Sequence, residues 1–289
     1  MTLRLMTWNI KTGGVDRGRG DRLDAIVRVV VRQAPDVLAL QELRDFDRDG
    51  HRRMWEVADA VGMTPHLARS AFGQPVGVLV RPPGVTLSTR AVRWRLHHAA
   101  AAVDVLTDRG PLTVVSTHLN PFSPYRRMRE ARWLAARYAS ATRAVVVAGD
   151  LNALDPWTDH AERLARLPPL YRRRHLGPDG SADTRTVSAF DAAGFADLWR
   201  VAGTGAGLTA PTTGGGGREF SGMRLDYVLG SPPVAAVTRD CQVVRGDESE
   251  YASDHYAVVA DLDMSLSAGG SGPPGSGGQR GGGSGARRS

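Results

Sequence analysis

The stretch Val145-Val146-Val147-Ala148-Gly149-Asp150-Leu151-Asn152 decides how the rest of the sequence is interpreted. Its first four residues are an unbroken apolar run, which is typical of a strand buried on both faces of a sheet. The run ends at Gly149, and a carboxylate and an amide follow two positions apart. Side chains two residues apart in extended backbone point the same way, so Asp150 and Asn152 can act on one bound group. Gly-Asp-x-Asn by itself is also a common turn.

Five further polar motifs follow or end strand-like apolar runs. They are Thr7-Trp8-Asn9-Ile10, Gln41-Glu42-Leu43, Ser116-Thr117-His118-Leu119-Asn120, Arg224-Leu225-Asp226-Tyr227 and Ser253-Asp254-His255. Polar residues at one strand end often only make a turn or a cap. Six such motifs in one chain indicate instead a single site assembled from many strand ends.

The side chains of these motifs fit the hydrolysis of a phosphoester. That reaction requires a neutralised phosphoryl group, an activated water and support for the leaving oxygen. Mg²⁺ takes oxygen ligands in proteins, commonly one or two carboxylates together with several waters. We therefore expect Asn9, Glu42 and Asp254 to bind Mg²⁺ or Mn²⁺. Taken alone, Glu42 also fits a solvated acid in a loop.

Asp226 and His255 are the natural acid–base pair of the chain. A carboxylate bonded to one imidazole nitrogen fixes the tautomer and favours the charged ring, which leaves the other nitrogen free to face a phosphate. His118 also ends a strand-like run, beside Asn120. Five other histidines are expected to be ordinary surface or packed residues: His66, His97, His98, His160 and His175.

Apolar periodicity predicts strands alternating with helices. The strands are expected at residues 3–10, 37–40, 76–80, 101–105, 112–116, 145–148, 225–229 and 256–262. The helices are expected between Asp21 and Pro35 and at residues 54–61, 123–138, 161–167 and 195–201. Residues 203–217 are expected to form a flexible loop. The stretch 156–186 has no clear periodicity beyond the helix at 161–167.

The six motifs, in this order, resemble those of the endonuclease/exonuclease/phosphatase family, which includes DNase I, apurinic endonucleases, sphingomyelinases and inositol-polyphosphate phosphatases. The resemblance runs from Thr7 to about Leu262. It implies an α/β (α+β) fold, a four-layer sandwich in which two packed mixed β-sheets are flanked by helices, with the motifs at one end. We expect one catalytic domain over residues 1–265.

The resemblance also implies a role for each motif. Asn9 and Glu42 bind the metal, with Asp254 near it. Asp150 activates the attacking water and Asn152 helps to position the phosphate. His255 and Asp226 form a dyad, and His118 faces the phosphate as a further catalytic residue. The apurinic-endonuclease branch carries Gln-Glu-Thr-Lys at the second motif and Tyr at the third, so Leu43, Arg44 and His118 make this chain less similar to that branch.

Composition and charge indicate what the protein can bind and where in the cell it is expected. The formal net charge is +7, with Lys11 as the only lysine, and an arginine-rich composition reflects either a polyanion-binding surface or a GC-rich coding sequence. A single cysteine, Cys241, excludes an intramolecular disulfide framework. No apolar run approaches the ~20 residues needed for a transmembrane helix, and the first residues read as a strand, not as a secretion signal. We expect a cytoplasmic monomer with a disordered Gly/Ser/Pro/Arg tail at 266–289.

Nucleic acid is the favoured substrate. The excess of basic over acidic residues favours a nucleic acid. Three arginines that follow the His118 motif also favour it, since they could line a phosphate backbone: Arg126, Arg127 and Arg129. Asn120, Arg126 and Arg127 are therefore predicted substrate contacts, although a solvated helix face with a salt bridge to Glu130 fits the same arginines.

Two other functions stay open. One is a phosphatase or phosphodiesterase acting on lipid or inositol phosphoesters. The other is a catalytically silent nucleic-acid-binding protein, against which the complete set of motifs counts. Binding of single strands by stacking would be indicated by a stripe of alternating aromatic and basic residues, and we find no such stripe in the sequence.

Overall fold

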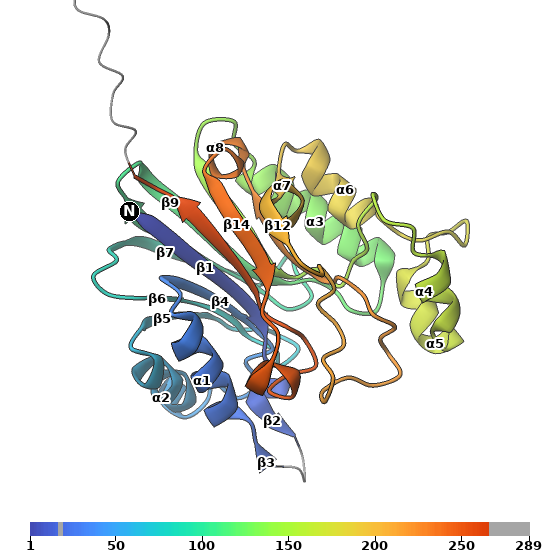
Figure 1. Ribbon diagram of the computed structural model, residues 1–289, viewed down its shortest axis with the longest axis horizontal. Coiled ribbons are helices and arrows are strands. Elements are labelled where there is room, and N and C mark those ends of the chain that lie inside the picture. Colours follow the sequence, from blue (N-terminus) through green and yellow to red (C-terminus); the bar gives the residue numbers. More distant parts are fainter. Residues whose placement is uncertain (17–19, 266–289) are drawn as a thin grey trace, which may run out of the picture.

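The computed structural model describes residues 1–16 and 20–265 of the chain. Two β-sheets pack face to face, and helices cover the outer face of each, which gives four layers (Figure 1). The predicted sandwich of two mixed sheets flanked by helices is therefore confirmed. The predicted disordered tail at 266–289 lies outside the described residues.

The larger sheet has seven strands among the described residues, with β1 at its centre. Their order is β12 (Gly203–Thr204), β14 (Thr238–Val243), β15 (Val258–Asp263), β1 (Thr2–Asn9), β4 (Val37–Gln41), β6 (Val76–Val80) and β5 (Thr64–Ala68). β1 runs parallel to β4 and antiparallel to β15. This sheet is mixed.

The second sheet has six strands in the same described part of the chain. Their order is β11 (Ala196–Asp197), β13 (Asp226–Gly230), β10 (Ala144–Asp150), β9 (Gly110–His118), β8 (Ala100–Thr107) and β7 (Thr86–Val92). β10 runs parallel to β9 and antiparallel to β13, so this sheet is mixed as well. A small ribbon pairs β2 (Val15–Asp16) with β3 (Gly20–Asp21).

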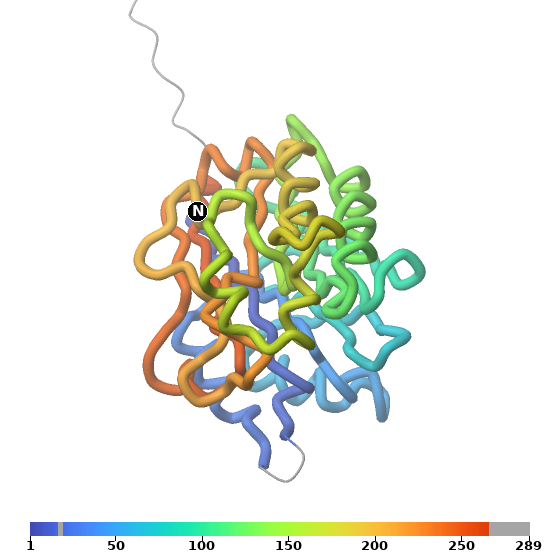
Figure 2. Tube along the Cα trace, turned by 90° about the vertical axis from the view of Figure 1, so that its right-hand side faces the viewer, coloured from blue at the N-terminus to red at the C-terminus, as the bar shows by residue number. Residues whose placement is uncertain are grey.

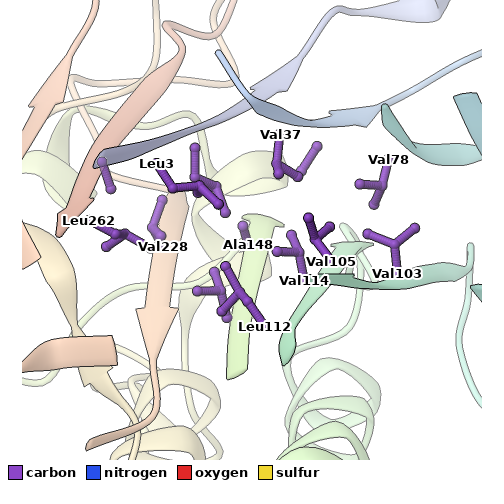
Figure 3. Close-up of a cluster of buried hydrophobic side chains, with 14 of the residues drawn as sticks. Leu3, Val37, Val78, Val103, Val105, Leu112, Val114, Ala148, Val228 and Leu262 are labelled. Carbon is purple, nitrogen blue, oxygen red and sulfur yellow. The ribbon is translucent and has the colours of Figure 1, made fainter. Parts of the chain in front are cut away.

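The main core lies between the two sheets. It is built from every second residue of the strands, because alternate side chains of a strand point to the same face. Labelled members are Leu3, Val37, Val78, Val103, Val105, Leu112, Val114, Ala148, Val228 and Leu262 (Figure 3). Full burial of one such Val or Leu side chain stabilises the fold by about 1.5–3 kcal/mol. The facing β-branched side chains thus fix how the two sheets are stacked.

The longer helices close the outer faces. α1 (Leu23–Gln33) and α2 (Arg52–Val61) pack on the larger sheet, over a second cluster that contains Trp8 and Leu40. α3 (Pro124–Tyr138) and α6 (Arg185–Ala192) pack on the other sheet, over a third cluster around Val147. The shorter helices are α4 (Ala161–Arg166), α5 (Pro169–Arg172), α7 (Leu198–Ala202) and α8 (Pro232–Ala235). Within the described residues, no helix is both long and apolar enough to cross a membrane.

Single-turn 3-10 helices complete the secondary structure. They are η1 (Thr12–Gly14), η2 (Asp49–His51), η3 (Arg173–His175) and η4 (Asp247–Glu250). The helix predicted at 195–201 begins only at Leu198, because residues 196–197 form β11 at the edge of the sheet. The loop predicted at 203–217 includes the short strand β12.

Candidate active site

Strand direction brings the six motifs to one end of the sandwich. Asn9 and Gln41 lie side by side at the ends of parallel β1 and β4. His118 and Asp150 do so at the ends of β9 and β10. β13 runs the opposite way and starts at Asp226, opposite Asp150, and the Ser-Asp-His motif directly precedes β15. Figure 2 views the molecule from the right-hand side of Figure 1, where loops from distant parts of the chain come together.

Asp150 lies at the centre of the site and is 1% exposed. Gly149 before it has a φ of 142°, and a Cβ there would lie 2.0 Å from the carbonyl oxygen of Thr117 on β9, so only glycine fits. The backbone N–H of Asn152 donates to Asp150 Oδ1 at 2.8 Å. Asn9 Nδ2 donates to Asp150 Oδ2 at 3.0 Å. These contacts orient the carboxylate and leave it little freedom.

His255 and Asp226 form a buried pair. His255 Nδ1 lies 2.7 Å from Asp226 Oδ2, and His255 Nε2 lies 3.9 Å from Asp150 Oδ2, so Nε2 faces the same space as Asp150. Burial alone would lower the pKa of His255, but the charges of Asp226 and Asp150 outweigh it and raise that pKa well above its usual value. The imidazole is therefore held in its charged form. Trp8 Nε1 donates to the carbonyl oxygen of His255 at 2.8 Å and fixes the backbone.

Glu42 and Asp254 supply two more carboxylates. Asn9 Nδ2 donates to Glu42 Oε1 at 3.2 Å, and the backbone N–H of Thr12 donates to Glu42 Oε2 at 2.9 Å. The ammonium of Lys11, the only lysine, lies 3.3 Å from Asp254 Oδ2. Burial raises the pKa of Asp254, and the negative charge of Glu42 adds to that rise. Two acids thus share one region of the site.

This donor set fits a hard divalent cation. The carboxylates of Glu42 and Asp254 carry the oxygen ligands that Mg²⁺ and Mn²⁺ prefer, and a cation would relieve the repulsion between the two acids. Asn9 would add its Oδ1, which in this structure accepts the backbone N–H of Lys11 at 3.0 Å. Another group in the described chain, Asp150, Asp226 and His255, has ligand atoms within 4.8 Å of one another. Because His255 Nδ1 is already bonded to Asp226, that second group is better suited to proton transfer.

His118 extends the site on the β9 side. Its Nε2 lies 3.5 Å from Asp150 Oδ2, while its Nδ1 has no hydrogen-bond partner among the described residues. Its ring stacks on His98 with centroids 4.4 Å apart. Burial lowers the pKa of His98 to about 2, so that ring is neutral. His98 thus supports His118 as an uncharged packing partner.

These residues surround an open hollow of about 590 Å³. Its lining includes Glu42, His118, Asp150, Asn152, Asp254 and His255. A larger hollow of about 710 Å³ lies at the other end of the six-stranded sheet, at the starts of β9 and β10, and none of the six motifs reaches it. The smaller hollow is therefore the candidate active site.

Three predicted substrate contacts are not part of this hollow. Arg127 is only 1% exposed, and its guanidinium donates to the carbonyl oxygens of Asn120 at 2.9 Å and Arg174 at 2.6 Å. Its side chain is used for packing, which corrects the prediction that it binds substrate. Asn120 Oδ1 accepts the N–H groups of Phe122 and Ser123 and so shapes the loop after β9. Arg126 and Asn120 line a neighbouring hollow instead.

The alternative of a salt bridge from these arginines to Glu130 is also not observed in the described chain. Glu130 accepts the backbone N–H of His97 at 2.7 Å and that of Asn120 at 2.8 Å. Its carboxylate therefore joins two loops beside the site.

The structure adds residues that the sequence analysis missed. Lys11 directly follows the first motif and Arg44 the second, so their positions could have marked them. Further lining residues come from loops or from η3 and had no sequence signal, among them Gln74, His97, His98, Phe122, Arg174 and His175. His98 and His175 are buried, as a packed histidine would be, yet both line the hollow.

Comparisons with known proteins agree with this geometry. A family model described as the Endonuclease/Exonuclease/phosphatase family matches residues 6–255. A structure named endonuclease/exonuclease/phosphatase from Bacteroides vulgatus has a TM-score of 0.69 at 15% identity, and the match covers 91% of this chain and 99% of that one. One of the same name from Beutenbergia cavernae DSM 12333 has a TM-score of 0.66 at 26% identity, covering 91% and 72%.

A third structure, the mannosyl-6-phosphatase Bt3783 of Bacteroides thetaiotaomicron VPI-5482, has a TM-score of 0.65 at 14% identity, covering 90% of this chain and 99% of its own. No curated protein sequence matches the chain. The family model covers most of the sequence, including all six motifs in whole or in part. This chain belongs to the endonuclease/exonuclease/phosphatase family.

Proposed function

We propose that this protein is a divalent-metal-dependent phosphodiesterase that cleaves nucleic acid with low sequence specificity. The proposal depends above all on the position of Asp150. It lies between the proposed metal-binding group around Glu42 and the imidazole of His255. A base, a charged acid and a set of metal ligands thus face one open hollow.

The chain's own residues supply the proton transfers. Asp150, whose carboxylate is held by Asn9 and by the backbone of Asn152, takes a proton from a water. The oxygen of that water bonds to phosphorus while the bond from phosphorus to the leaving oxygen breaks, and the leaving oxygen takes up a proton from solvent. His255, kept charged by Asp226, donates through Nε2 to the phosphoryl group as charge develops there. Asn152 and His118 line the hollow and orient the phosphate.

Asn9, Glu42 and Asp254 would hold Mg²⁺ or Mn²⁺. When bound, this ion would neutralise negative charge on the phosphoryl oxygens. Lys11 pairs with Asp254 and holds that carboxylate in place.

Arginines on the rim support nucleic acid as substrate. Arg44 and Arg174 line the hollow, and the chain as a whole carries a formal charge of +7. Such a surface attracts a polyanionic backbone without reading its sequence. We also propose that the protein acts as a cytoplasmic monomer.

The test is a substrate panel at equal metal concentration: plasmid DNA, RNA, sphingomyelin vesicles, soluble inositol phosphates and a sugar phosphate. We expect robust cleavage of DNA or RNA with Mg²⁺ or Mn²⁺ and none with EDTA. Glu42→Gln should require more metal for the same rate, while its fold is unchanged. Turnover confined to a substrate other than nucleic acid would overturn the nuclease proposal. Full activity in metal-free buffer would overturn the metal assignment.

A phosphatase is the second candidate, because a protein named as a phosphatase shares this fold. In the panel it would release inorganic phosphate from the sugar or inositol phosphates and leave DNA intact.

A further inference from the structure

The candidate active site continues into a second hollow of about 430 Å³ on the side of α3. The two hollows share Phe72 and His97 in their linings. The second one is otherwise lined by residues of the loop before β8 and of α3, including Trp94, Arg95, Arg126 and Arg129. A ligand bound at Asp150 can therefore extend along this surface.

Exposed aromatic rings concentrate along this path. Trp94 is 92% exposed, Phe72 61% and Phe122 60%, and each comes from a different loop. Single exposed apolar residues are common, but a group of them beside a polar hollow marks a binding surface. These three rings are such a group.

Phe72 begins a continuous series of rings that runs through three histidines to the candidate active site. Phe72 stacks on His97 with centroids 4.2 Å apart and an interplanar angle of 16°. His97 touches His98 edge to face at 4.5 Å, and His98 stacks on His118 at 4.4 Å. His118 Nε2 then lies 3.5 Å from Asp150 Oδ2. A flat ring stacked on Phe72, the outer end of this series, would thus lie at the hollow that Asp150 also lines, three ring contacts out from His118.

The charges along the second hollow are unbalanced. Arg95, Arg126 and Arg129 form no ion pair with any described residue. Glu130, on whose pKa the charge of Arg126 acts, is the only acid among the described residues of the lining. The Glu130 carboxylate is buried and turned toward two backbone N–H groups. The arginines are therefore left to meet an anion from outside.

We propose that the second hollow binds unpaired nucleotides next to the scissile phosphate, with bases stacked on Trp94 and Phe72 and phosphates bound by Arg126 and Arg129. This inference rests on the proposed nuclease function and narrows its substrate to single strands or frayed ends. Ring stacking requires the face of a base, which neighbouring pairs cover inside a duplex. No such stripe stands out in the sequence, because Phe72, Arg126 and Arg129 lie in segments far from Trp94.

The first experiment measures binding of a short fluorescent oligothymidylate and of the same strand paired with its complement, in the Asp150→Asn background with Mg²⁺. Loss of one stacking ring should weaken single-strand binding by about 10-fold in Trp94→Ala. Trp94→Phe should restore most of it, because a ring remains. Trp55→Ala is the control: Trp55 lies on α2, is half exposed and does not line either hollow, so its loss should change nothing. Duplex binding should respond much less to Trp94→Ala.

The second experiment compares Arg126→Ala with Arg52→Ala, which removes the same charge from α2. Arg126→Ala should weaken single-strand binding and reduce its dependence on salt, and Arg52→Ala should do neither. If the protein cleaves DNA but Trp94→Ala behaves as Trp55→Ala does, the subsite is refuted and the nuclease function stands. If the protein neither binds nor cleaves any nucleic acid, the proposed function fails and the subsite fails with it.

Discussion

Asp150 and His255 face the same space with opposite charges, and different neighbours fix each of them. Asn9 and the backbone of Asn152 donate to Asp150 and orient its carboxylate. Asp226 accepts from His255 and favours its imidazolium. The proposed base and the proposed acid can therefore coexist within 3.9 Å. This division of roles depends on hydrogen bonds that a single substitution removes.

The first residue-scale prediction concerns turnover. Asp150→Asn removes the proton acceptor and His255→Ala removes the charged donor, so each should lower kcat by at least ~10²-fold, within the range typical of general acid–base catalysis. Steady-state kinetics at saturating substrate, with circular dichroism to verify the fold, would measure this. Near wild-type turnover in either variant would refute the role given to that residue.

Glu130 yields a prediction for pH. Burial raises its pKa to about 7 from 4.5, although two backbone N–H groups and nearby arginines oppose the rise. The folded state thus binds a proton more tightly than the unfolded chain does. The stabilisation from this group is complete below pH 4.5 and is lost as pH rises through about 7.

Thermal unfolding of the wild type and of Glu130→Gln can measure that loss. Between about pH 5 and about pH 8, the wild type should lose up to ~3 kcal/mol relative to the variant, whose side chain does not titrate. A stability difference that stays constant over this range would show that the carboxylate is not perturbed.

Which residues meet in the site could be predicted because strand direction decides it. Asn9, Glu42 and Asp150 follow apolar strands, and the ends of parallel strands lie at the same edge of a sheet. Contacts such as that between His98 and His118 could not be predicted, because they depend on the path of a loop, and loops have no apolar periodicity.

At the scale of elements, the strands and helices with the strongest apolar patterns were predicted best. α3 begins at Pro124, and Ser123 caps it, because Ser123 Oγ accepts the N–H of Arg126. β7 and β14 were not predicted, since both are partly exposed and carry mixed polar residues. Their place in the sheets comes from pairing with β8 and β15, which is a long-range contact.

The helical period of α3 explains why Arg127 differs from its neighbour. Arg127 shares helical spacing with Ala131, Leu134 and Tyr138, all buried, whereas Arg126 lies on the exposed face. The period was therefore a signal that Arg127 faces inward. Its two hydrogen bonds join α3 to the loop after β9 and to η3.

An element-scale prediction follows for this helix. Arg127→Met keeps most of the apolar stem but leaves the carbonyls of Asn120 and Arg174 without their donor, so it should cost about 3 kcal/mol or more of stability. Arg126→Met, one position away, should stay within about 0.5 kcal/mol. Urea unfolding of the two variants would measure both values. Equal stability of the two proteins would contradict a structural role for Arg127.

At the scale of the whole molecule, the site joins the two sheets. Asn9 on β1 donates to Asp150 on β10, and buried Gln41 on β4 donates to Ser116 Oγ on β9 at 3.1 Å. The proposed ligands Asn9, Glu42 and Asp254 all belong to the larger sheet or to loops next to it, while Asp150 belongs to the other. Because Asn9 also donates to Asp150 on the other sheet, binding of a cation should stabilise both sheets together, and not a single loop.

Metal titration followed by thermal unfolding tests this coupling. A ligand that binds only the folded state stabilises it by about 2.7 kcal/mol at a concentration 100-fold above its Kd, so Mg²⁺ should raise Tm by several degrees in one cooperative transition. Glu42→Gln should lose most of this rise. Glu248→Gln should keep it, because Glu248 is paired with Arg28 and Arg32 away from the hollow. Sodium chloride at matched ionic strength separates metal binding from screening. An equal Mg²⁺ response in Glu42→Gln and wild type would mean that the cation stabilises the protein elsewhere, and the ligand assignment would have to be abandoned.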